Sequence, residues 1–200
     1  FLQGYDTKIM ETDRALWTLA TAARSAGLEG VFAATPVDQL AGALTRQPGA
    51  AGWRARLSDF LDQYGHRTEG TADIALASWI EDPTPALGMI KTFLQTPRDH
   101  DFATAHLLAV QEREAAIDAT RSRLTREEQR IFDAGLTSVQ TANFPQWQDD
   151  HNFYIDLRVA LPLRWAALAI ADRVGADRPD DTLFLFWPEL IAVATGERDF

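Results

Sequence analysis

Cysteine is absent from this chain of 200 residues. The sequence therefore excludes a disulfide, a thiolate metal site and a cysteine nucleophile. Long apolar runs are missing too, since no stretch reaches the roughly eighteen residues of a membrane-spanning helix, and residues 1–13 lack the order of a secretory signal. We expect a cytoplasmic protein with no membrane partner. The first residue, Phe1 rather than Met, indicates a chain cut from a longer polypeptide or processed.

Positive charge is scarce as well. The chain has 19 lysine and arginine residues against 29 aspartate and glutamate residues, and its net charge is −10. Its lysines, Lys8 and Lys91, lie far apart in the sequence instead of forming a stripe that could neutralise phosphates. Nucleic acid is therefore not an expected partner.

Several catalytic signatures are also missing. The sequence contains neither glycine-rich phosphate loop and no G-x-S-x-G nucleophile turn. Its four histidines, His66, His100, His106 and His151, never stand four apart, so the helical two-histidine zinc pattern is absent. We expect no metal site, no cofactor bound by this chain and no activity with ATP alone.

What the sequence does have is helical periodicity, marked off by cap-and-proline signals. It predicts an all-α fold, with more than half of the residues helical, in a single multi-helix bundle over residues 1–200. Two long helices and an ordered loop around residues 65–83 are its main features. The expected helical segments are 7–26, 37–46, 50–64, 84–95, 98–142, 145–174 and 187–195.

Three details of this pattern concern helix boundaries. Segment 98–142 is one long helix or a broken pair, because the capping-box spacing at Thr125 fits a break near Leu124 and also an unbroken helix. Segment 145–174 should be largely buried, and Pro162 should kink or divide it near Arg158. Residues 182–186 form a short extended run.

A first polar cluster lies in the expected loop. It combines acidic, basic and aromatic groups where helical periodicity is low. The cluster contains His66, Arg67, Trp79 and Glu81, with Glu69 and Asp73 between them. Two interpretations stand: an ordered loop pinned to the helices by an ion pair of Arg67 with Glu69, Asp73 or Glu81, or the lining of a pocket.

A second cluster lies on the expected helix 145–174. Trp147, His151, Tyr154 and Arg158 stand at i, i+4, i+7 and i+11, so one stripe presents an indole, an imidazole, a phenol and a guanidinium. Such a stripe could hold a flat ligand and move a proton. A histidine that is buried and hydrogen-bonded to a carboxylate for structural reasons fits the same pattern.

These clusters belong to a longer series of matching runs. The runs are residues 1–8 (Phe-Leu-Gln-Gly-Tyr-Asp-Thr-Lys), 60–67 ending in Gly-His-Arg, the Trp79-x-Glu81-Asp82-Pro83 element, residues 147–156, and 181–185 followed by Pro188-Glu189-Leu190. In this order they resemble the helical region of phosphoenolpyruvate-synthase-like phosphotransferases, which include rifampin phosphotransferase and the phenylphosphate-synthase type. The similarity spans essentially the whole chain.

The resemblance implies a division of labour between domains. An ATP-grasp domain, which holds ATP and Mg, phosphorylates a histidine on a small swivelling domain, and that domain carries the phosphoryl group to an acceptor held by the helical domain. This chain resembles only the acceptor-binding part, because the Thr-Gly-Gly…His element of the swivelling domain has no counterpart here. The implied partners are a small, aromatic hydroxyl or ketone acceptor and the ATP-grasp and phosphohistidine domains.

The resemblance also suggests roles for the two clusters. His151 would take the proton of the acceptor, oriented by Asp150 or Asp156, while Arg67 and Arg158 would face the phosphoryl oxygens. The substrate-binding residues would be His66, Trp79, Glu81, Trp147, Tyr154, Asp156 and Arg158.

This arrangement makes one structural prediction. Residues 64–82 should fold back over the helix at 147–158, so that His66 or Arg67 faces one cavity with His151. A non-catalytic binding module, or a linker that only couples moving domains, is the alternative function.

Overall fold

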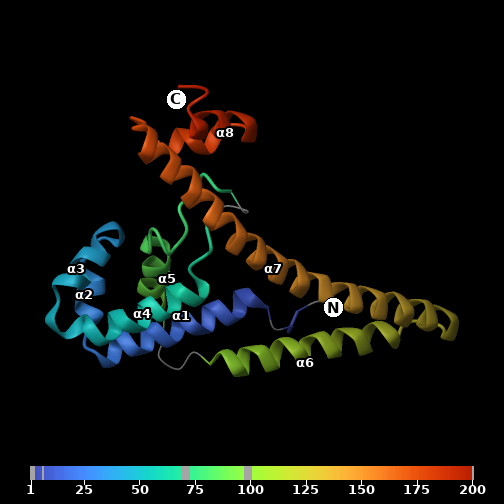
Figure 1. Cartoon of the computed structure of the whole chain (residues 1–200). Helices are drawn as coiled ribbons and strands as arrows, with labels where there is room; N and C mark the ends of the chain where they lie inside the picture. The colour runs from blue at the N-terminus through green and yellow to red at the C-terminus, as the bar shows by residue number, and fades with distance from the viewer. Residues whose placement is uncertain (1–2, 6, 69–72, 97–100, 200) are drawn as a thin grey trace.

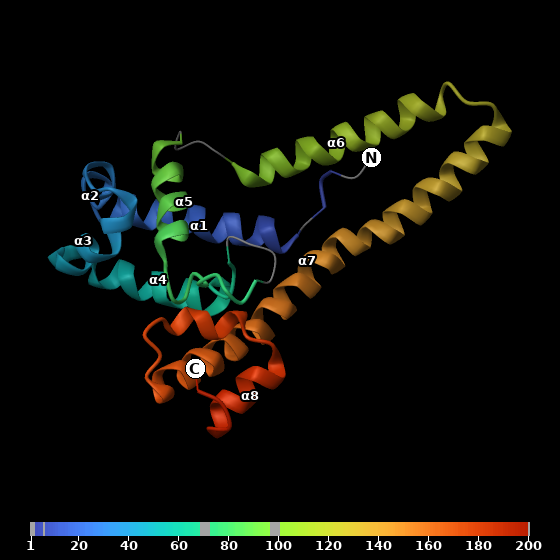
Figure 2. The ribbon, with the colours of Figure 1, turned by 90° about the horizontal axis from the view of Figure 1, so that it is seen from above.

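The computed structural model describes residues 3–5, 7–68, 73–96 and 101–199, and for residues 142–154 and 156 it describes the helical backbone but not the side chains. Every regular element within these ranges is a helix, which confirms the predicted all-α class. Figures 1 and 2 show a body of short helices with two long helices extending from it as an arm. The elements are α1 (Lys8–Ser25), α2 (Glu29–Ala34), η1 (Val37–Gln39), α3 (Leu40–Arg46), η2 (Pro48–Ala50), α4 (Ala51–Tyr64), α5 (Thr84–Gln95), α6 (Phe102–Arg121), α7 (Arg126–Val174), η3 (Pro179–Phe184) and α8 (Trp187–Thr195).

The hydrophobic core lies where α1 packs against α4 and α5. The apolar residues of α1 recur at helical spacing and are buried on one side, as the sequence predicts. Trp53 of α4 reaches across and donates its indole N–H to the carbonyl oxygen of Leu19, 2.9 Å away. The buried members on α1 and α5 are Leu16, Leu19, Ala20, Ala23, Ala86, Leu87 and Ile90.

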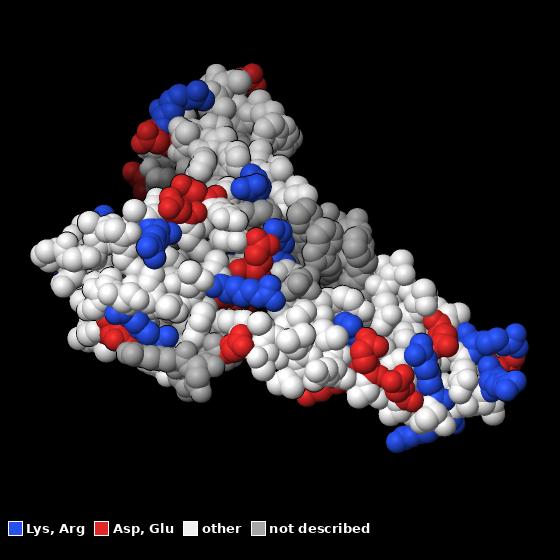
Figure 3. Space-filling view, turned by 90° about the horizontal axis from the view of Figure 1, so that it is seen from below, with Lys and Arg blue, Asp and Glu red and all other residues white. Residues whose placement is uncertain are grey.

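The predicted segment 98–142 contains two helices rather than one long helix. α6 ends at Arg121, and α7 begins at Arg126 with a capping box in which Thr125 and Glu128 exchange hydrogen bonds. From this tip the two helices run back toward the body and move apart (Figure 2). On the face shown in Figure 3, basic and acidic side chains alternate at the tip and form no continuous basic stripe.

The prolines of α7 do not have the predicted effect on helix boundaries. α7 runs unbroken from Arg126 to Val174, so the segment does not begin at Pro145 and Pro162 does not divide it near Arg158. A proline costs its own N–H bond and about 3 kcal/mol inside a helix. Here Leu157 and Leu161 are buried before Pro162, and Ala167 and Ala171 are buried after it. This packing on both sides holds the helix together.

Two shorter elements also differ from the sequence-based expectation. Residues 182–186 do not form an extended run, because Pro179–Phe184 is the 3₁₀ helix η3. Thr182 stabilises this turn by donating its hydroxyl to the carbonyl oxygen of Pro179, 2.7 Å away. The short helix α2 was not predicted. The described parts of the loop, residues 65–68 and 73–83, contain no helix, as expected.

Candidate functional site

The two ends of the loop between α4 and α5 are joined by backbone hydrogen bonds. Trp79 donates its backbone N–H to the carbonyl oxygen of Arg67 at 2.9 Å, and Ile80 donates to that of Gly65 at 3.0 Å. Gly65 makes this approach possible, because a Cβ built there would lie 2.4 Å from the oxygen of Leu61 and 2.7 Å from Cγ1 of Ile80. The glycine therefore allows the part of the loop around Ile80 to lie directly against the end of α4.

Replacing Gly65 with alanine should destabilise the protein by roughly 1–3 kcal/mol, because the methyl group overlaps a carbonyl oxygen that cannot move away freely. Gly135 is the matched control, since a Cβ there meets nothing within 4 Å and the residue lies inside α7. Gly135→Ala should stabilise the protein by about 0.5–1 kcal/mol. Urea unfolding of both variants measures the difference, and an unchanged Gly65→Ala midpoint would show that the loop closes without this contact.

Arg164 of α7 fastens the loop to the helix. Its side chain is 10% exposed, and its Nε donates to Oε1 of Glu81 at 3.0 Å. Its Nη1 donates to the carbonyl oxygens of Ile74 at 2.8 Å and Ala75 at 3.1 Å, and its Nη2 lies 3.6 Å from Oδ1 of Asp180 in η3. One guanidinium thus joins three parts of the chain, using the fan of donors that arginine offers.

The carboxylate of Glu81 holds the loop against α7 and is not available to a ligand. Its Oε2 accepts hydrogen bonds from the backbone N–H of Ser78 at 2.9 Å and from the Ser78 hydroxyl at 3.0 Å. Burial alone would raise the pKa of Glu81, but the hydrogen bonds from Ser78 and Arg164 outweigh it and lower the pKa below 4.5. Glu81 is therefore ionised at neutral pH and engaged on both oxygens.

Between the loop and α7 lies a small, partly open cavity of about 10 Å³. Its walls are largely apolar, with hydroxyl, carboxyl, imidazole and guanidinium groups among them. This is room for about one water molecule, far below the roughly 300–1,000 Å³ usual for drug-sized ligands. Any acceptor therefore needs the loop to move away from α7. The lining residues are His66, Thr68, Asp73, Ile74, Leu76, Ser78, Leu157, Ala160, Leu161 and Arg164.

His66 is the imidazole of this cavity. Burial lowers its pKa from 6.5, the positive charge of Arg158 lowers it further, and the carboxylate of Asp62 opposes both effects. The ring is therefore neutral at pH 7 and able to accept a proton. Arg158, the last residue of the predicted stripe on α7, is thus within electrostatic range of the loop histidine. The structure brings these two predicted site residues together.

The other predicted loop residues lie elsewhere. Trp79 is buried in the core, where its ring stacks on Phe60 with centroids 6.4 Å apart. Arg67 faces α1: burial raises the pKa of Asp13, and the charge of Arg67 opposes that shift. Of His66, Arg67, Trp79 and Glu81, only His66 lines the cavity.

The predicted contact between the loop and α7 is present. Among the described side chains the loop meets α7 at Leu157, Ala160, Leu161 and Arg164, so the contact includes the end of the predicted range 147–158 and continues beyond it. The remaining site predictions lie outside the described side chains. These are Trp147, Asp150, His151, Tyr154 and Asp156, all within the α7 backbone.

The sequence analysis missed Arg164, although a signal was available. It is a single basic residue inside the apolar run Leu161-Pro162-Leu163-Arg164-Trp165-Ala166-Ala167. A charge in such a run is rarely buried without a partner.

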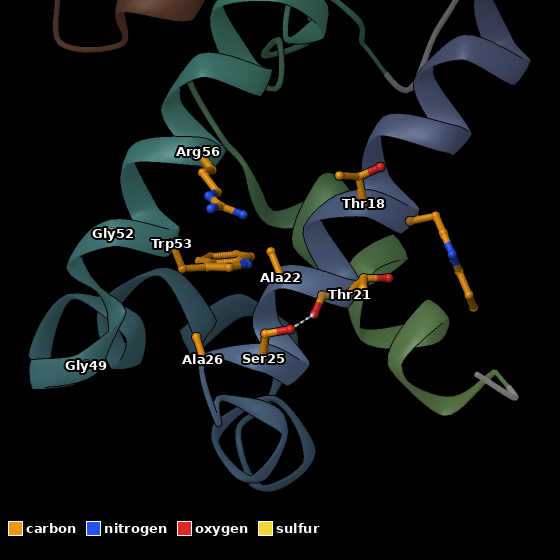
Figure 4. Close-up of a pocket in the computed structure, with 10 residues that line it drawn as sticks. Thr18, Thr21, Ala22, Ser25, Ala26, Gly49, Gly52, Trp53 and Arg56 are labelled. Atoms are coloured by element: carbon orange, nitrogen blue, oxygen red, sulfur yellow. Dashed lines mark hydrogen bonds between the residues drawn. The ribbon is translucent and has the colours of Figure 1, made fainter. Parts of the chain in front are cut away.

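A wider groove lies between α1 and α4, away from this cavity. Figure 4 shows Thr18, Thr21 and Ser25 of α1 on one side and Arg56 of α4 on the other. The groove is open, and its walls contain no carboxylate or imidazole. A site that must move a proton needs such a group. The smaller cavity is therefore the candidate site.

Within the described residues, no group of three or more histidine, aspartate or glutamate side chains is placed to hold a metal ion. None of the helices searched there is long and apolar enough to cross a membrane.

Comparison with known proteins places the chain among phosphotransferases. Residues 1–144 match the family model of the rifampicin phosphotransferase fourth domain. The chain is 25% identical over 202 residues to an uncharacterized phosphotransferase, YvkC, of Bacillus subtilis (strain 168), and the alignment covers 94% of this chain. It is 30% identical over 179 residues to chondramide synthase cmdD of Chondromyces crocatus, an alignment that covers 86% of this chain.

These matches define the chain as an all-α domain of the phosphotransferase class. It belongs to the family of the rifampicin phosphotransferase fourth domain, which confirms the resemblance to the helical region of phosphoenolpyruvate-synthase-like proteins. The chain spans 23% of the length of the Bacillus relative and 4% of the length of the Chondromyces relative. The family model includes the loop at 65–83 but ends before the α7 wall of the cavity.

Proposed function

We propose that this chain holds the acceptor in an ATP-dependent, phosphohistidine-relayed phosphotransfer. The observation that supports it best is the contact of the loop with α7, which brings the neutral imidazole of His66 within electrostatic range of Arg158 beside apolar side chains of α7. Transfer breaks the N–P bond of the phosphohistidine and forms an O–P bond on the acceptor. A base takes the proton that is released, which is the hydroxyl proton of a hydroxyl acceptor or the α-carbon proton of a ketone. Such a reaction needs positioning, a proton acceptor and exclusion of water.

In this proposal the loop moves away from α7 and the acceptor lies against Leu157 and Leu161. Arg158 is the proposed cation for the phosphoryl oxygens, because a guanidinium group binds such oxygens with paired donors. His151, oriented by Asp150 or Asp156, stays the proposed base. A small aromatic hydroxyl or ketone compound is the acceptor we propose, since the walls are mostly apolar.

The experiment supplies the chain with the ATP-grasp and phosphohistidine domains of its own phosphotransferase system. ATP and Mg bind to the ATP-grasp partner in this proposal. With both partners present, phosphoryl groups should reach a small hydroxyl or ketone compound, and the chain alone should turn over no ATP. Steady ATP hydrolysis by the purified chain would contradict the proposal.

A non-catalytic role in coupling domains is the second candidate. It is favoured by α7, a single helix of 49 residues that contributes to the arm, the loop contact and the packing of η3. A rigid helix of that length would carry movement from one end to the other. Phosphoryl transfer that depends on the cavity residues separates the two functions.

The shifted pKa of His66 predicts how stability depends on pH. Because the folded protein lowers this pKa, the stabilising contribution is complete above pH 6.5 and is lost as the pH falls through the lower folded value. His66→Asn should therefore lose less unfolding free energy than the wild type between pH 7.5 and acidic pH. Urea unfolding of both proteins at each pH measures this difference. Equal losses would show that His66 titrates as it does in the unfolded chain.

A further inference from the structure

Helix α7 has two apolar faces, and only one of them is covered. The covered face consists of Leu157, Leu161, Ala167 and Ala171, which are buried against the loop, η3 and α8. The other face consists of apolar residues at intervals of four, four, three and four, which place them along one side of a helix. This outer stripe is made of Ile155, Val159, Leu163, Ala166 and Ile170.

The outer stripe is exposed from Ile155 to Ala166, and Ile170 at its end is half-buried. Val159 is 59% exposed, Leu163 52% and Ile155 47%. Single exposed apolar residues are common on proteins, but a continuous row of them marks a surface that another structure covers. Residues 145–174 were expected to be largely buried because the segment is rich in apolar side chains, but this face of it is exposed. The row follows the same turns of α7 whose other side carries the loop and the cavity.

Two features of the chain decide between possible occupants. A net charge of −10 on 200 residues opposes pairing with a second copy, because both copies repel each other. Each relative carries this domain inside a much longer chain, of which it is 23% or 4%, and the matching family is defined as a fourth domain. In these relatives the domain therefore lies in the same chain as other domains, which are available to cover the outer stripe.

We infer that the outer stripe docks against an apolar face of another domain of the phosphotransferase. The surface is apolar rather than charged, which is typical of lasting interfaces and not of brief encounters. Its occupant is therefore a domain that stays in place during turnover. This inference rests on family membership and holds whether or not the cavity binds an acceptor.

The absence of cysteine provides the test, since a single introduced thiol is the only one in the chain. Val159→Cys reports on the outer stripe, and Ser138→Cys, exposed on the arm half of α7, is the matched control. A thiol reagent should label both at similar rates in the isolated chain. Adding the remaining domains of the phosphotransferase, with their own cysteines replaced, should slow labelling at position 159 by roughly tenfold or more and leave position 138 unchanged.

A second pair of variants tests binding directly. Val159→Glu should weaken association with the remaining domains by roughly tenfold or more, because it buries a carboxylate in the interface, whereas Ser138→Glu should not. Both should keep the wild-type helicity and melting temperature, since both positions are exposed. Equal labelling at position 159 with and without the other domains would overturn the inference. A second result would also overturn it: the thiol at position 159 is protected in the isolated chain, the protection rises with protein concentration, and sedimentation shows a dimer. In that case a second copy of the chain would cover the outer stripe.

Discussion

Replacing His151 with alanine should lower phosphoryl transfer to the acceptor by about 10²–10⁴-fold, the usual effect of removing a general base. His151 is the proposed proton acceptor, and it lies on α7 in a predicted stripe whose last residue, Arg158, affects the pKa of His66 in the cavity. The measurement is single-turnover transfer from the phosphohistidine partner, with thermal unfolding recorded on the same protein. His106→Ala on α6 is the control and should transfer at the wild-type rate.

The structural interpretation of His151 gives a different result. Loss of a buried hydrogen-bonded side chain costs roughly 1–3 kcal/mol of stability and leaves the surviving folded protein active. A His151→Ala variant with a lowered melting temperature and full transfer activity would remove His151 from the mechanism.

Arg164→Met should destabilise the protein by about 3–5 kcal/mol, because it leaves the Glu81 carboxylate buried without its cation. It also leaves the carbonyl oxygens of Ile74 and Ala75 without the donor they now have. Unfolding in urea gives the free energy, and hydrogen exchange at residues 73–81 shows whether the loop has left α7. The loop amides should exchange faster in the variant than in the wild type.

Two further variants separate the anchor from a general effect of losing an arginine. Arg130→Met removes an exposed pair with Glu127 on the arm and should cost less than about 1 kcal/mol. Adding Glu81→Leu to Arg164→Met should recover part of the loss, since no unpaired charge then remains. A loss below about 1 kcal/mol in Arg164→Met alone would show that other contacts hold the loop.

The parts of the fold that depend on local signals could be predicted from the sequence. Thr125 forms the capping box that its spacing allowed, and Gly65, Gly175 and Gly196 follow helix ends. The apolar spacing of α1 predicted the residues it buries. Each of these outcomes depends on groups only a few residues apart, which the sequence shows directly.

The parts that depend on tertiary packing could not be predicted in this way. Pro162 ends or kinks many helices, yet α7 continues through it because Leu157 and Leu161 on one side and Ala167 on the other are buried. The loop reaches α7 at Arg164, a contact 83 residues away from Glu81 in the sequence. Spacing within a cluster shows which groups share a helix face, but not which distant segment covers it. The sequence therefore predicted the pair of elements that meet, but not that their contact extends along α7 to Arg164.

Ala160→Phe tests whether the acceptor binds where the loop meets α7. Ala160 lines the cavity and is only partly exposed, so the added ring should fill the space that the acceptor needs. Ala134→Phe, exposed on the arm, is the matched control. With the partner domains supplied, Ala160→Phe should lose at least about 10²-fold in transfer, the cost of misplacing a bound reactant, while folding normally and leaving phosphorylation of the partner histidine intact. Wild-type transfer by a folded Ala160→Phe protein would contradict the claim.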